Sequence, residues 1–104
     1  MNITEFEILR KIYNKSASSQ RKLSKELDTS LGKVNYCLNA LIQKGYVKIT
    51  NFKKSENKTK YLYVLTPKGI SEKTKLTINF MRKKMQEYDE LQEELKLIKE
   101  KDKD

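Results

Sequence analysis

The spacing of the hydrophobic residues changes once along this chain, at Gly45. Before Gly45, apolar residues recur every three or four positions, as they do on the buried side of a helix. After it, the runs 46–50 (YVKIT) and 60–66 (KYLYVLT) alternate or are rich in β-branched and aromatic residues, which is typical of strands. A second helical pattern begins near Thr66 and reaches about Lys99. The sequence therefore predicts a mainly α fold with a small β-hairpin, ordered as three helices, two strands and one long helix.

The first predicted helix spans residues 3–14 and is amphipathic. Glu5, Glu7, Arg10 and Lys11 are expected to face outward. Its apolar stripe consists of Ile3, Phe6, Leu9, Ile12 and Tyr13.

The second predicted helix is short and starts after a cap at Ser18 or Ser19, with Leu23 and Leu27 four positions apart. A tight link follows, and Thr29 or Ser30 is expected to cap the third helix. Gly45 is expected to end that third helix as a C-terminal glycine. The apolar stripe of the third helix consists of Val34, Cys37, Leu38, Leu41 and Ile42.

The outer face of the third helix carries the residue types that read DNA bases. A short helix, a turn and a second helix with a polar outer face is the arrangement that places the second helix in the major groove. Asparagine and glutamine can pair with adenine, lysine can reach guanine or phosphate, and small residues allow close approach. An ordinary solvated face remains the alternative. The predicted DNA-binding residues of this helix are Ser30, Gly32, Lys33, Tyr36, Asn39, Ala40 and Gln43.

The connection between the two predicted strands is polar and rich in lysine, which suits phosphate contacts beside the groove. Alone, such a turn would be read as a solvated loop. Directly after a helix-turn-helix, it predicts the wing of a winged helix. The predicted wing contacts are Lys53, Lys54, Asn57, Lys58 and Lys60.

The last helix is expected to begin with Thr66 as its cap and Pro67 in its first turn. Gly69 is expected to lower the stability of this helix by about 1 kcal/mol relative to alanine. The chain is divided into a winged-helix domain at 1–70 and a C-terminal segment at 71–104, whose end is expected to be disordered. An interchain coiled coil or antiparallel helix pair is expected for this segment, although Lys84 interrupts its apolar pattern. A solvated single helix is the alternative. The predicted homodimer contacts are Met81, Met85, Tyr88, Leu91, Leu95 and Ile98.

The positive charge is concentrated in the predicted winged-helix domain. Residues 1–70 hold 14 Lys and Arg against 5 Asp and Glu, whereas residues 71–104 hold nine of each. A basic domain joined to a charge-balanced segment indicates a polyanionic partner for the domain and a different role for the segment.

Several function classes are disfavoured by composition. The chain has no histidine and one cysteine, Cys37, so neither a zinc site, an internal disulfide nor a nucleophile with a histidine base is expected. Cys37 falls on an apolar stripe and is expected in the core. No segment resembles a membrane span or a signal peptide, which predicts a cytoplasmic protein. Without histidine and with its one cysteine in the core, the chain is not expected to be an enzyme, and no cofactor is expected.

Two stretches carry a family resemblance. SLGKVNYCLNALIQKGYVKITNF and YVLTPKGISEKTKLTINFMRKKMQEYDELQEEL resemble the small MarR-type winged-helix regulators associated with exopolysaccharide gene clusters. LTPKG is shared with MarR proteins broadly, and GKVNYCLNAL is closer to the subgroup. The resemblance implies a dimeric transcription factor with its third helix in the major groove of double-stranded DNA.

Two departures from the family pattern qualify that expectation. The wing segment KKSENKTK lacks the arginine that many MarR wings insert into the minor groove, so its contacts are expected to be lysine to phosphate. The chain is shorter than full-size MarR proteins, and no small-molecule ligand is evident. A winged helix that binds an acidic protein partner is the alternative function.

Overall fold

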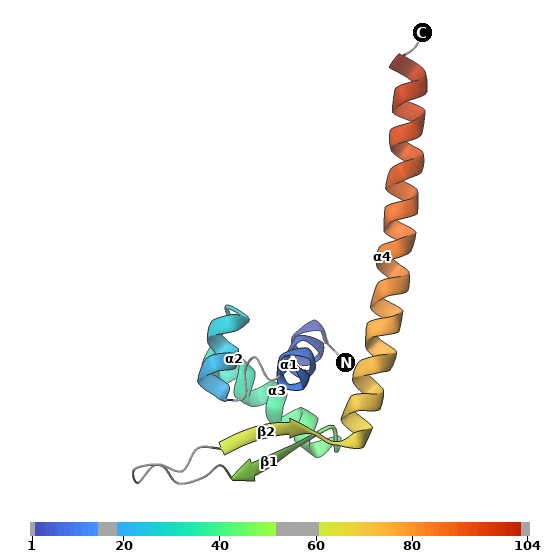
Figure 1. The fold of residues 1–104 in the computed structure, drawn as a ribbon. Helices are drawn as coiled ribbons and strands as arrows, with labels where there is room; N and C mark the ends of the chain where they lie inside the picture. Colours follow the sequence, from blue (N-terminus) through green and yellow to red (C-terminus); the bar gives the residue numbers. More distant parts are fainter. Residues whose placement is uncertain (1, 15–18, 52–60, 103–104) are drawn as a thin grey trace. The chain divides into compact units, whose positions relative to one another are not determined.

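The computed structural model describes residues 2–14, 19–51 and 61–102 (Figure 1). It divides the chain into two compact units, Met1–Thr74 and Lys75–Asp104. The first unit contains three helices, a two-stranded sheet and the first turns of the last helix; the second unit is the remainder of that helix. This confirms the predicted mainly α fold with a hairpin and a long C-terminal helix.

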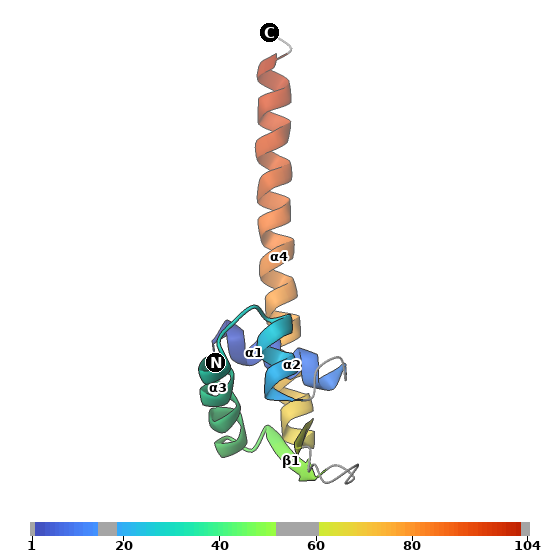
Figure 2. The same ribbon diagram turned by 90° about the vertical axis from the view of Figure 1, so that its left-hand side faces the viewer.

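The elements follow the predicted order. The helices α1, α2 and α3 pack in the first unit, where α3 contacts both other helices (Figure 2). Strands β1 and β2 are antiparallel and pair Val47 with Leu65 and Ile49 with Tyr63. The bounds are α1 Ile3–Tyr13, α2 Gln20–Glu26, α3 Leu31–Gln43, β1 Val47–Asn51, β2 Tyr61–Leu65 and α4 Pro67–Asp102.

The core of the first unit lies where the three helices meet the sheet. Helix α1 contacts β2 and α3 contacts β1, so the apolar sides of these two helices meet the hairpin, while α2 packs against α3. The stripe predicted for α3 is buried except for Ile42, which is partly exposed. The buried apolar residues are Phe6, Ile8, Leu9, Ile12, Leu23, Val34, Cys37, Leu38, Leu41, Val47 and Tyr63.

The predicted faces of α1 were partly wrong. Glu5, expected outward, is only 5% exposed, and its carboxylate pairs with the Lys44 ammonium at 3.5 Å. Ile3 and Tyr13, expected in the stripe, are exposed, whereas Ile8 is fully buried. Helix α1 contacts both α3 and β2, so the buried arc is wider than a single stripe and lies away from the helix ends.

The strand pattern also needs one correction. Val47 is buried, but Ile49, which the alternation places beside it, is 48% exposed. The two residues share a face of the sheet. Tyr63, the partner of Ile49 in β2, is buried, so the exposure at this pair is confined to the β1 side.

The predicted helix ends are confirmed at Ser19, Ser30 and Gly45. Ser19 and Ser30 cap α2 and α3, each accepting a hydrogen bond from the backbone N–H three residues on. Gly45 follows α3 with a φ of +79°, a left-handed conformation that favours glycine. The Gly45 and Tyr46 N–H groups donate to the carbonyls of Ile42 and Leu41, which completes a Schellman motif.

The start of α4 is tied to the end of α3. The Thr66 hydroxyl accepts from the Gly69 N–H and donates to the Gly45 carbonyl, and the Thr66 N–H donates to the Tyr46 carbonyl at 3.0 Å. At Gly69, a Cβ would lie 1.9 Å from that same Tyr46 oxygen. The predicted account of Gly69 as a mere helix-propensity loss was therefore incomplete, because the close approach requires glycine.

Candidate nucleic-acid interface

The outer face of α3 is open to solvent in the structure. Tyr36 is 74% exposed, and Gly32, Lys33, Asn39 and Gln43 are also exposed, whereas Ala40 is partly covered. Ser30 lies at the N-terminus of this face but uses its hydroxyl to cap the Lys33 N–H. The structure thus groups the residues predicted on α3 along one side of a helix, opposite the buried stripe of Val34, Leu38 and Leu41.

A chain of side-chain hydrogen bonds fixes part of this face. The Asn39 Nδ2 donates to the Asn35 Oδ1 at 3.0 Å, and the Asn35 Nδ2 donates to the Gln20 Oε1 at 3.3 Å. The Gln20 Nε2 in turn donates to the Tyr63 hydroxyl at 3.0 Å. The chain therefore links β2, the start of α2 and the middle of α3.

The direction of these hydrogen bonds determines which atoms Asn39 presents. Its amide nitrogen has two hydrogens, and only one is given to Asn35. The second N–H and Oδ1 form the donor and acceptor pair that matches the major-groove edge of adenine. Sequence reasoning missed Asn35 and Gln20. The four-residue spacing of Asn35 and Asn39 could have revealed the first, but nothing local points to the contact with Gln20.

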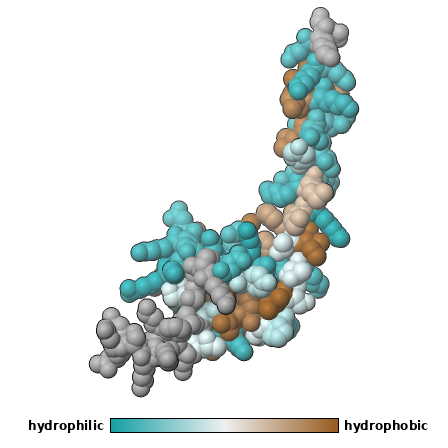
Figure 3. Space-filling view, in the orientation of Figure 1, coloured by the Kyte–Doolittle hydropathy of each residue, from teal (hydrophilic) through white to brown (hydrophobic). Residues whose placement is uncertain are grey.

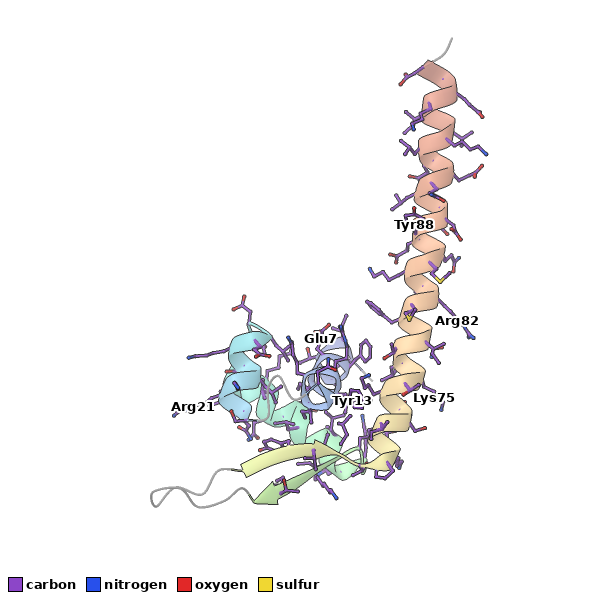
Figure 4. All side chains as sticks on the ribbon, viewed as in Figure 1. Glu7, Tyr13, Arg21, Lys75, Arg82 and Tyr88 are labelled. Carbon is purple, nitrogen blue, oxygen red and sulfur yellow. The ribbon has the colours of Figure 1, made fainter. Side chains whose placement is uncertain are left out.

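Helix α2 adds exposed positive charge beside α3. Leu23 is its one buried residue, and Arg21, Lys22 and Lys25 are exposed. Figure 4 shows Arg21 pointing outward from α2. In helix-turn-helix proteins the helix before the recognition helix crosses the phosphate backbone, and exposed cations on such a helix are of the residue type that contacts phosphates. The inward position of Leu23 in QRKLSKEL was the signal that could have identified them.

The wing residues are not part of the described structure. Lys53, Lys54, Asn57, Lys58 and Lys60 lie outside the described residues, and their role stays a prediction. The described strands lead into and out of that segment, with Asn51 paired to Tyr61.

Cys37 is buried, as expected, and is 1% exposed. Burial, and secondarily the nearby Glu5 carboxylate, raises the pKa of its thiol. A buried thiol with a raised pKa is poorly reactive, which supports a packing role.

The apolar residues predicted for dimerisation are exposed along the second unit. Helix α4 is one helix of 36 residues, and brown patches recur along it in Figure 3. The structure also exposes Ile78, Phe80 and Leu97, at 45%, 38% and 56%, none of which was predicted. Of these three, only Ile78 continues the three- and four-residue spacing of the predicted six. We call the following seven residues the α4 stripe: Ile78, Met81, Met85, Tyr88, Leu91, Leu95 and Ile98.

Neither a metal site nor a membrane span is found in the part of the chain that the structure describes. Within residues 2–14, 19–51 and 61–102, no group of three Cys, Asp or Glu side chains is arranged to hold a metal ion. None of the helices in this described part is long and apolar enough to cross a membrane.

Comparison with known proteins supports the same architecture. Residues 1–48 match a family model described as winged helix-turn-helix DNA-binding. No curated protein is significantly similar in sequence. Among solved structures, the chain is similar to the zinc-responsive MarR family member ZitR of Lactococcus lactis, with a TM-score of 0.67 and 23% identity over 88% of this chain and 60% of that one.

Two similar structures were solved with DNA. FabT of Streptococcus pneumoniae gives a TM-score of 0.63 and 26% identity over 84% of this chain and 59% of that one. PadR of Bacillus subtilis, bound to operator DNA, gives a TM-score of 0.62 and 16% identity over 75% of this chain and 48% of that one. The chain spans about half to three-fifths of the length of these relatives. Its fold is that of a winged helix-turn-helix protein, shared with MarR-family regulators.

Proposed function

We propose that the protein is a transcriptional regulator that binds double-stranded DNA sequence-specifically through α3. The observation that carries this proposal is the exposed polar face of α3, where Asn39 is held by Asn35 in an orientation that suits adenine. The exposed cations of α2 support it, because they flank α3 where phosphates would lie. The DNA complexes of FabT and PadR also support it by likeness of fold.

The protein is further proposed to act as a homodimer on a palindromic operator. The α4 stripe is exposed in the single chain, and an apolar stripe of this length gains stability when a second copy covers it. A two-fold dimer presents two recognition helices, so its operator would contain two inverted half-sites about one helical turn apart. The sequence resemblance supports exopolysaccharide genes as targets.

Selection of bound duplexes from fragments of the source genome tests these proposals. The expected result is enrichment of a short inverted repeat upstream of a small set of genes. A protein that enriches no sequence, while still binding DNA, would contradict base reading by α3. If it binds no duplex at low salt but retains an acidic protein, the alternative role as an assembly module would replace this one.

A further inference from the structure

We propose that the α4 helices of two copies pair antiparallel, with Tyr88 of each copy facing the other at the two-fold axis. This inference rests on the proposed homodimer and specifies its interface. It concerns the second unit, Lys75–Asp104, which contains the whole α4 stripe.

The spacing of the α4 stripe is symmetric about Tyr88. Read along the chain, its steps are three, four and three residues up to Tyr88, and three, four and three after it. The members therefore pair off at equal distances from Tyr88: Met85 with Leu91 at three residues, Met81 with Leu95 at seven, and Ile78 with Ile98 at ten.

This symmetry is what antiparallel self-pairing requires. When a helix packs against an inverted copy of itself, a residue before the axis meets the residue equally far beyond it. A pattern that reads the same in both directions therefore buries every member of the stripe. Parallel pairing matches each residue with itself and places no such condition on the spacing. The repeated step of three at Tyr88 also breaks the heptad phase there, as an insertion of three residues does.

The charges of α4 point to the same orientation. Arg82, Lys83 and Lys84 lie four to six residues before Tyr88. The acidic run, Glu93 and Glu94, lies five and six residues after it. An antiparallel pair sets the basic run of one copy opposite the acidic run of the other. A parallel pair sets each run beside its own copy, where like charges repel.

One ion pair across the interface can be named. At 100° per residue, Lys84 and Glu94 flank the stripe on the same side, and in the antiparallel pair they lie at nearly the same height. In the single chain Lys84 contacts Glu87 at 3.4 Å, with both side chains exposed, so it can turn to the partner's carboxylate without desolvating a buried group. Tyr88 and Arg82 project from different sides of α4 (Figure 4).

The arrangement at the axis suits a tyrosine. The Gln92 Nε2 donates to the Tyr88 hydroxyl at 3.0 Å within the same helix. This hydrogen bond gives the hydroxyl oxygen a partner on its own helix, so the ring can pack against its symmetry mate without losing that hydrogen bond.

Disulfide trapping tests the orientation. Met81→Cys chains are mixed with Leu95→Cys chains of different mass, exchanged under reducing conditions, and oxidised in a glutathione buffer. The expected product is the mixed disulfide between positions 81 and 95. Tyr88→Cys should form a disulfide with its own copy, and the native chain, whose single Cys37 is buried, should form none. Homotypic disulfides at 81 and at 95 would overturn the proposal.

Charge exchange gives a second, independent measurement on the full chain. Lys84→Glu alone should weaken the dimer by about 2- to 5-fold for each ion pair replaced, and adding Glu94→Lys should restore it. A double variant that stays weakened would contradict the antiparallel pair. If sedimentation shows the native chain to be monomeric at every concentration, the homodimer itself fails. If it is dimeric but Tyr88→Cys does not cross-link, the interface lies elsewhere and only the proposal made here fails.

Discussion

Replacing Gly69 with alanine separates the helix-propensity account of this residue from the packing account. Gly69 lies in the first turns of α4, and propensity alone predicts that alanine stabilises a helix by up to about 1 kcal/mol. The packing predicts the opposite sign, because the new Cβ would lie 1.9 Å from the Tyr46 carbonyl oxygen and 2.8 Å from its carbon.

The size of the expected loss in stability depends on which atoms must move to make room for the new Cβ. The obstacle is backbone, which cannot swing aside as a flexible side chain would, and overpacking of this kind costs about 1–3 kcal/mol. The Tyr46 oxygen also accepts the Thr66 N–H at 3.0 Å, and losing that hydrogen bond adds about 1 kcal/mol. After subtracting the propensity gain, we expect a net loss of about 2 kcal/mol, or about 8–16 °C in Tm for a domain of this size.

Thermal and urea unfolding followed by circular dichroism measures this loss at a fixed protomer concentration. Gly32→Ala is the matched control, since nothing lies within 4 Å of a Cβ at that exposed helical position. Gly32→Ala should hold or raise the free energy of unfolding, while Gly69→Ala lowers it. Equal stabilisation by both substitutions would refute the close approach of α4 to Tyr46.

Four further predictions concern DNA binding by the basic domain, the base preference set by Asn35, the buried Cys37 and the C-terminal half of α4. DNA affinity should fall steeply between low and moderate salt, as measured by fluorescence anisotropy, and a flat profile would contradict phosphate contacts by the basic domain. Asn35→Ala should relax the preference for one base pair of the operator without changing affinity for random duplex; equal losses on both would make Asn35 merely structural. The Cys37 thiol should react with a disulfide reagent at pH 8 only as the chain unfolds, because burial raises its pKa; rapid reaction of the folded protein would contradict its place in the core. A chain truncated before Tyr88 should sediment as a monomer or a weaker dimer that still folds through residue 70, and an unchanged dimer would move the interface to another surface.

The local features of the fold were predictable from the sequence. The caps at Ser19 and Ser30, the glycine end of α3 at Gly45, and the start of α4 at Thr66 and Pro67 each depend on a few neighbouring residues. The buried stripe of α3 could likewise be read from its period.

The features that sequence reasoning missed depend on contacts between distant segments. Glu5 is buried on α1, which packs against α3 and β2, and Lys44, just after the end of α3, pairs with its carboxylate. Gly69 is needed because α4 begins against the Tyr46 carbonyl. The outer face of α3 was predicted, but the hydrogen-bonded chain that orients Asn39 passes through Gln20, 15 residues before Asn35. Hydrophobic periodicity and helix propensity depend on neighbouring residues, so they do not reveal contacts between segments that are distant in the sequence.

We propose that Asn39 reads a base while the cations of α2 contact phosphates. The direct test is the ratio of affinities for the selected operator and for a scrambled duplex, measured for the native chain, Asn39→Ala and Arg21→Ala. We expect Asn39→Ala to lose about 1–3 kcal/mol on the operator alone, which lowers the ratio about 5- to 150-fold. Arg21→Ala should weaken both duplexes about equally and leave the ratio unchanged. A ratio unchanged by Asn39→Ala, or lowered as much by Arg21→Ala, would contradict the account.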